Sequence, residues 1–168
     1  SKLLDFRNFL YLCWKHLNLP EPTTLQYSIA NFIQGDDQRL VINAFRGIGK
    51  SWISSVFVCH QLLLDPQKNI LVVSASKNRA DDFSTFTLRL INEIDVLAHL
   101  RPLESQRQSK VSFDVRPARA SHAPSVKSLG ITSQLTGSRS DLVIADDVET
   151  SQNSATMGMR DKLSTQVK

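Results

Sequence analysis

The chain has 168 residues, 41% of them hydrophobic and 21% charged, with a formal net charge of +4 that is compatible with a nucleic-acid partner. At this length a chain buries roughly two-thirds of its unfolded surface, so neither disulfides nor a structural metal is needed to hold a core. No apolar run approaches the roughly 20 residues of a membrane-spanning helix, and the first residues lack the layout of a signal peptide.

Residues 1–36 are expected to form an N-terminal helical segment. Apolar residues recur at three- and four-residue spacing over residues 3–17, which predicts an amphipathic helix. After a turn with two prolines, Thr23 or Thr24 can cap a second helix with Leu25 on its apolar face.

Two cysteines, Cys13 and Cys59, lie within apolar helical patterns. Because cysteine packs as a small hydrophobe, both are expected to be buried free thiols. A reducing, cytoplasmic compartment fits this expectation.

Short apolar runs alternate with helical patterns over residues 37–168. Buried strands are predicted at residues 40–42, 70–73, 126–131 and 142–145. Helices are predicted at residues 52–64 and 77–100, and a strand with one wet face at residues 111–115; a hairpin is possible over residues 110–131. Strands that alternate with helices predict an α/β fold with a mostly parallel sheet and helices on both faces.

A loop with two glycines joins the first predicted strand to the next helix. Its residues are Ala44, Phe45, Arg46, Gly47, Ile48, Gly49, Lys50 and Ser51. Backbone N–H groups of such a loop, with the helix N-terminus behind them, can hold the phosphates of a nucleoside triphosphate. Lys50 would contact the β- and γ-phosphates, and the Ser51 hydroxyl would hold Mg²⁺. Ala44 departs from the usual glycine, and a turn with an exposed lysine is the alternative.

Acidic residues follow the last predicted strand. Ligands bind at the carboxyl ends of strands in open α/β sheets, so these carboxylates are expected at a binding site. Asp146 would hold the water shell of Mg²⁺, and Asp147 or Glu149 would orient or deprotonate the attacking water. A strand end with solvated acids is the alternative.

Two arginines are candidates for neutralising charge on the transferred phosphoryl group. Arg46 lies inside the loop, and Arg139 lies ahead of the acidic strand in a segment with Gly137 and two serines. Such a segment suits a residue that reaches a neighbouring subunit as an arginine finger. Ordinary surface arginines are the alternative for both.

Together, residues 44–51, 73–77, 135–141 and 144–149 resemble the motifs of phage terminase large subunits. The likeness is greatest to the DNA maturase B type of short-tailed bacteriophages, and it covers nearly the whole chain. It implies a P-loop NTPase of the ASCE type that uses ATP and Mg²⁺ to pump double-stranded DNA into a procapsid in the host cytoplasm. It also implies three protein partners: the portal protein, the small terminase subunit and further copies of the chain in a ring, with a pentamer expected.

The resemblance carries further implications for single residues. An adenine-contacting glutamine precedes the loop in this family, and Gln26 occupies that position, although a polar residue on a helix face is the alternative. The acidic pair is Asp146–Asp147, where many terminases have Asp-Glu. The catalytic carboxylate therefore stays open between Asp147 and Glu149.

The family also has segments that this sequence is not expected to contain. One is a strand with a coupling motif, which lies between the acidic strand and the P-loop strand. The other is a metal-dependent nuclease domain. The ATPase core at residues 37–168 is therefore expected to be incomplete. Two other functions compete: a helicase-like or AAA-type ATPase, and a non-catalytic, nucleotide-gated binding module.

Overall fold

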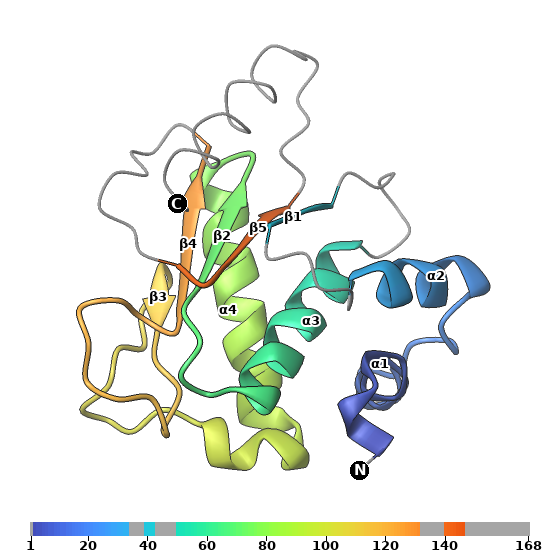
Figure 1. Ribbon diagram of the computed structural model, residues 1–168, viewed down its shortest axis with the longest axis horizontal. Helices are drawn as coiled ribbons and strands as arrows, with labels where there is room; N and C mark the ends of the chain where they lie inside the picture. The colour runs from blue at the N-terminus through green and yellow to red at the C-terminus, as the bar shows by residue number, and fades with distance from the viewer. Residues whose placement is uncertain (1, 34–38, 43–49, 132–139, 147–168) are drawn as a thin grey trace.

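The computed structural model describes residues 2–33, 39–42, 50–131 and 140–146. Over these ranges the chain is mixed α/β, with a five-stranded, mostly parallel sheet and helices packed against it (Figure 1). The predicted fold class is confirmed at this level. None of the helices in the described ranges combines the length and apolar character that a membrane crossing requires.

The elements follow the predicted order. The helices in these ranges are α1 (Phe6–His16), α2 (Thr24–Ile33), α3 (Lys50–Leu64) and α4 (Lys77–Glu93), with 3-10 turns η1 (Lys2–Leu4) and η2 (Asp95–Leu100). The strands are β1 (Arg39–Ile42), β2 (Ile70–Ser74), β3 (Ser112–Phe113), β4 (Val126–Gly130) and β5 (Leu142–Asp146).

The sheet has the strand order β1-β5-β2-β4-β3. Strands β1, β5, β2 and β4 are parallel, and β3 pairs antiparallel with β4, which confirms the predicted hairpin. The chain returns after β4 to place β5 between β1 and β2, so the connection through α3 passes over β5. In the described part of the chain β1 and β5 are direct neighbours, at the place where the family resemblance implies a further strand.

Side chains of the sheet alternate between two buried clusters. Ile70 and Val72 of β2, with Leu142 and Ile144 of β5, pack with α1, α3 and α4 in the main core. The residues between them on the same strands form a second cluster: Leu71, Val73, Val143 and Ala145. Helices were predicted on both faces, and the described helices contribute to the first cluster only.

Helix α3 is the central helix of the main core. Every residue from 53 to 60 is buried, as the all-round apolar pattern predicts. Cys13 of α1 and Cys59 of α3 are both buried free thiols, as predicted. Burial raises the pKa of the Cys13 thiol to about 12, so it stays protonated and unreactive near neutral pH.

Two predicted helices are shorter than their apolar periodicity suggests. The pattern over residues 3–17 breaks at Asp5, whose carboxylate accepts a hydrogen bond from the Arg7 N–H at 2.9 Å and caps α1. The region 77–100 breaks at Ile94, which has an extended backbone and a buried side chain. The apolar pattern then continues in the 3-10 turn η2. Capping sets the start of α1 and burial sets the end of α4, without a change in the apolar pattern.

Two smaller expectations are also wrong. The strand predicted at residues 111–115 is only Ser112–Phe113, although the predicted alternation holds because Phe113 and Val115 are buried. Leu25 was placed on the apolar face of the second helix, and it is 54% exposed.

His60 of α3 ties the core to the start of the chain. Its Nε2 lies 2.8 Å from the Leu3 carbonyl oxygen, and its ring centroid lies 5.4 Å from Phe6 and 5.2 Å from Phe9. Since a carbonyl oxygen only accepts, Nε2 carries the proton of the neutral ring. Burial is the main cause that lowers the pKa of His60.

We expect acidification to destabilise the protein through His60. The unfolded chain takes up the proton at the ordinary histidine pKa of about 6.5, whereas the folded chain takes it up only at lower pH. Stability therefore falls as the pH drops below about 6.5, until the folded-state pKa is passed. Urea unfolding of His60→Gln at pH 7 and pH 5 should show a smaller loss than in the parent. His99→Gln, at an exposed site, should keep the parental loss. Equal losses in all three proteins would rule out this role.

Candidate functional site

The carboxyl ends of the parallel strands meet at one edge of the sheet. Ile42, the last residue of β1, is the Cα partner of Asp146 at the end of β5. Asp146 is also the partner of Ser74 at the end of β2, and Ser74 is the partner of Gly130 at the end of β4. One row of Cα partners therefore joins the last residue of the strand before the predicted phosphate loop to the first predicted acid. This edge is where open α/β sheets bind their ligands.

The structure places the backbone of three predicted site residues. Lys50 and Ser51 open the first turn of α3, and Asp146 closes β5. The strand before the predicted loop and the helix after it are therefore both present. Outside the described residues lie Ala44, Phe45, Arg46, Gly47, Ile48, Gly49, Arg139, Asp147 and Glu149.

The start of α3 has the electrostatics of an anion site. The helix is 15 residues long and begins at Lys50. The first N–H groups of any α-helix have no partner within the helix, and its N-terminus carries a partial positive charge. Both features favour phosphate groups at this end. Ser51 in the first turn and Asp146 at the end of β5 are also of the residue types that bind Mg²⁺, by a hydroxyl and a carboxylate.

Gln26 lies in a capping box at the start of α2. Its Oε1 accepts a hydrogen bond from the Thr23 N–H at 2.9 Å, and the Thr23 hydroxyl accepts one from the Gln26 N–H at 3.1 Å. Of the two predicted caps, Thr23 is therefore the one used. The spacing of Thr23 and Gln26 is itself the sequence signature of a capping box. The structure gives Gln26 a helix-capping role, and its adenine contact stays a prediction.

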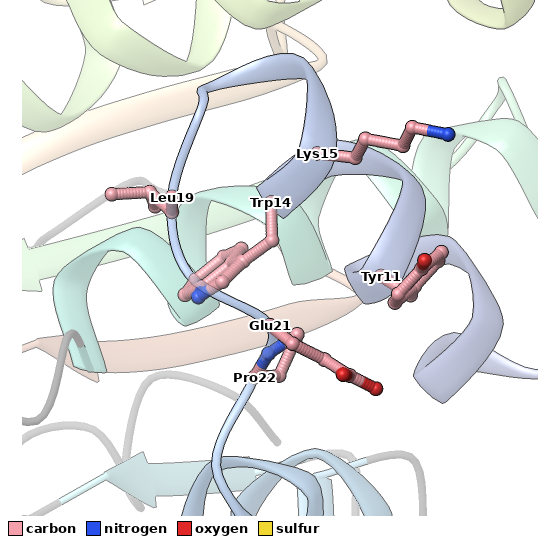
Figure 2. Close-up of a pocket in the computed structure, with 6 residues that line it drawn as sticks. All are labelled: Tyr11, Trp14, Lys15, Leu19, Glu21 and Pro22. Carbon is pink, nitrogen blue, oxygen red and sulfur yellow. The ribbon is translucent and has the colours of Figure 1, made fainter.

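A cavity of about 140 Å³ lies between α1 and the segment that leads to α2 (Figure 2). Its lining residues are Tyr11, Trp14, Lys15, Leu19, Glu21 and Pro22. In Figure 2 the Trp14 indole lies between Leu19 and Pro22, whereas the Lys15 side chain extends away from it. Sites for drug-sized ligands occupy roughly 300 Å³ or more, so this cavity suits a single ring-sized group.

The turn that ends α1 shapes this cavity. Asn18 has a φ of 57°, in the left-handed region. The Leu19 N–H donates to the Trp14 carbonyl at 3.0 Å, and the Asn18 N–H donates to the Lys15 carbonyl at 3.1 Å. This pair of bonds is a Schellman motif, in which the residue after the left-handed position often packs on the last helical turn. It brings Leu19 back beside Trp14.

Gly130 is a residue of the carboxyl edge that sequence reasoning missed. A Cβ at this position would lie 2.8 Å from the Lys77 nitrogen and 3.0 Å from the Ser76 carbonyl carbon. Only glycine therefore lets the end of β4 approach the start of α4, where the Ser76 hydroxyl accepts a hydrogen bond from the Arg79 N–H at 3.2 Å. A glycine that closes an apolar strand was the available signal.

Comparison with known proteins supplies a relative for nearly the whole chain. No family model matches it. It is 54% identical over 164 residues to the terminase large subunit of Enterobacteria phage T3. The match covers 97% of this chain and 28% of the relative, so the chain spans little more than a quarter of that protein's length. The resemblance predicted from the motifs is confirmed, and over the matched part the chain is a homologue of a phage terminase large subunit.

Proposed function

We propose that the chain forms the ATP-binding part of a viral DNA-packaging motor, which hydrolyses ATP to move double-stranded DNA into a procapsid. The row of Ile42, Asp146 and Ser74 at the carboxyl edge carries the proposal. It sets the first predicted acid beside the strand that precedes the loop, in a sheet compatible with a P-loop fold. The homology to a terminase large subunit supports the packaging role.

In this proposal the nucleotide lies across the carboxyl edge. Residues 44–51 would surround its phosphates, with Lys50 on the β- and γ-phosphates and the positive end of α3 behind them. Ser51 and Asp146 would hold Mg²⁺, the latter through water. When bound, that ion neutralises charge on the phosphates. Arg46 would add positive charge from within the loop, and Gln26 would contact the adenine.

The same function requires macromolecular partners. Double-stranded DNA is the substrate that moves, and the portal protein of the procapsid is the entrance through which it passes. The small terminase subunit and further copies of the chain, in a ring that we propose to be a pentamer, complete the assembly in the host cytoplasm. We also propose that the complete protein is an endonuclease.

We expect Asp146 to hold Mg²⁺, and Asp147 or Glu149 to act on the attacking water. We expect Asp146→Asn to raise the Mg²⁺ concentration for half-maximal turnover by about tenfold or more, because it loses a ligand of the ion's water shell. Whichever of Asp147→Asn and Glu149→Gln binds ATP without hydrolysing it is the catalytic carboxylate. We favour Asp147, since it directly follows the metal-binding acid.

Mg²⁺ titrations of turnover, together with ATP-binding measurements on each variant, check this division. Asp141→Asn is the matched control. Its carboxylate accepts a hydrogen bond from the Asn69 N–H at 2.9 Å, at the opposite end of β5. Parental hydrolysis by both Asp147→Asn and Glu149→Gln would refute the assignment.

Steady-state ATP turnover by the complete protein tests the function as a whole. A packaging motor should be stimulated when DNA and portal-bearing procapsids are present together. Stimulation by DNA alone would indicate a helicase-like ATPase instead. Binding without turnover under every condition would indicate a nucleotide-gated module.

A further inference from the structure

Three aromatic rings from three helices meet at the start of α3. Trp52 follows Lys50 and Ser51 in the first turn of that helix. Its ring centroid lies 6.4 Å from that of Trp14 on α1, with an interplanar angle of 72°, and 5.5 Å from that of Phe86 on α4, with an angle of 34°. Both separations are in the range of aromatic pairs that attract each other. The first turn of α3 is thus bracketed by its two neighbouring helices.

Trp14 and Phe86, the two rings that contact Trp52, are both held firmly in place. Trp14 is only 3% exposed and belongs to the main core. Phe86 is half-buried and packs against the same core. The His16 Nε2 also lies 3.3 Å from the Glu93 carboxylate, which links the end of α1 to α4. Trp52 therefore rests on two surfaces that are held independently of the predicted phosphate loop.

Trp52 itself is not an ordinary core residue. It is 41% exposed, whereas residues 53–60, which follow it in α3, are all buried. Those residues already fix the body of the helix in the core. Because the ring lies at the helix end and half in solvent, its contacts with Trp14 and Phe86 bear on the direction of the first turn more than on the burial of α3.

We propose that Trp52 is a positioning residue for the phosphates of ATP. Held between Trp14 and Phe86, it fixes the first turn of α3, and with it the N–H groups and Lys50 that would meet the phosphates. The inference rests on the proposed function. It extends the nucleotide site to α1, a helix far upstream of the loop in sequence. Hydrogen bonds weaken steeply when their geometry is distorted, so a displaced first turn would bind the phosphates less tightly.

A positioning role and a purely structural role predict different kinetics. If Trp52 only helps the protein fold, its loss reduces the folded fraction. The apparent kcat then falls and the KM for ATP is unchanged. If Trp52 positions the first turn, the folded enzyme itself binds phosphates less well, and the KM rises.

The experiment compares Trp52→Ala, Trp52→Phe and Leu64→Ala in the complete protein. Leu64 is the matched control, because it is 45% exposed and lies in the last turn of the same helix. We expect Trp52→Ala to raise the KM for ATP by about tenfold, which is about 1.4 kcal/mol. Trp52→Phe keeps a ring and should stay within about twofold of the parent, as should Leu64→Ala. Thermal unfolding shows that the variants compared are folded.

Several results would overturn the inference. They are a parental KM in folded Trp52→Ala, an equal rise in Leu64→Ala, or no rescue by Trp52→Phe. If Trp52→Ala does not fold, Phe86→Ala is tested instead. This variant removes one of the two rings that contact Trp52, and it must raise the KM for ATP. If the parent itself turns over no ATP, the proposed function has failed. If the parent is active and only the KM prediction fails, the proposed function stands without this role for Trp52.

Discussion

Replacing Lys50 by alanine in the complete protein should lower ATP turnover by about 10²–10³-fold or more. Removing a single preorganised group that stabilises transition-state charge costs this much in other enzymes. Phosphoryl transfer depends almost entirely on positioning and electrostatics, so the loss falls on the chemical step. Lys50 opens α3 and belongs to the last part of the predicted loop. Initial-rate measurements at saturating ATP and Mg²⁺ give the comparison.

Lys68→Ala is the control for the loss of a lysine. Lys68 lies just before β2, and its Nζ donates to the Gln61 Oε1 at 2.8 Å, so it belongs to the opposite end of that strand. This variant should keep the parental rate. If Lys50→Ala turns over ATP at a rate close to that of Lys68→Ala, the assignment of residues 44–51 as a phosphate loop is wrong.

Arg139 should work between subunits, with an effect of about 10³-fold or more on turnover, as for other arginine fingers supplied in trans. It precedes the acidic strand in a segment with glycine and serine, which suits a side chain that reaches outward. Arg139→Ala and Lys50→Ala proteins should each be inactive alone. Mixed, some interfaces would join an intact loop to an intact Arg139, so partial turnover should return.

The mixing experiment needs proof that the two variants assemble together, for example by co-purification through a tag on one of them. Arg119→Ala is the control for the loss of an arginine, because that arginine is exposed in the loop that precedes β4. It should be active without mixing. If co-assembled Arg139→Ala and Lys50→Ala show no recovery, Arg139 acts within its own subunit or only structurally.

The parts of the fold that sequence reasoning predicted are those with strong local patterns. Strands β2 and β5 are β-branched apolar runs, and both are buried as expected. Helix α3 is apolar all round and lies in the core. That Ile42, Asp146 and Ser74 lie at one edge follows from a parallel sheet, because the carboxyl ends of parallel strands share an edge.

The parts that it missed depend on contacts between distant residues. Nothing local indicates that β5 inserts between β1 and β2, which is a choice of strand order. Gly130 is needed only because α4 begins against it. The apolar pattern of α3 does not distinguish Trp52 from the buried residues that follow it, and its partners Trp14 and Phe86 are distant in sequence. For Gln26 the sequence contained both a capping signature and a family position, and the structure shows the capping bonds.

Equilibrium binding of ATP and AMP to the complete protein, with and without Mg²⁺, examines the proposed phosphate site without relying on turnover. If residues 44–51 hold the β- and γ-phosphates beside Asp146, ATP should bind far more tightly than AMP. Mg²⁺ should strengthen the binding of ATP only, and Lys50→Ala should abolish the difference between the two nucleotides. Equal affinities for ATP and AMP in the parent protein would mean that the loop before α3 does not bind phosphates.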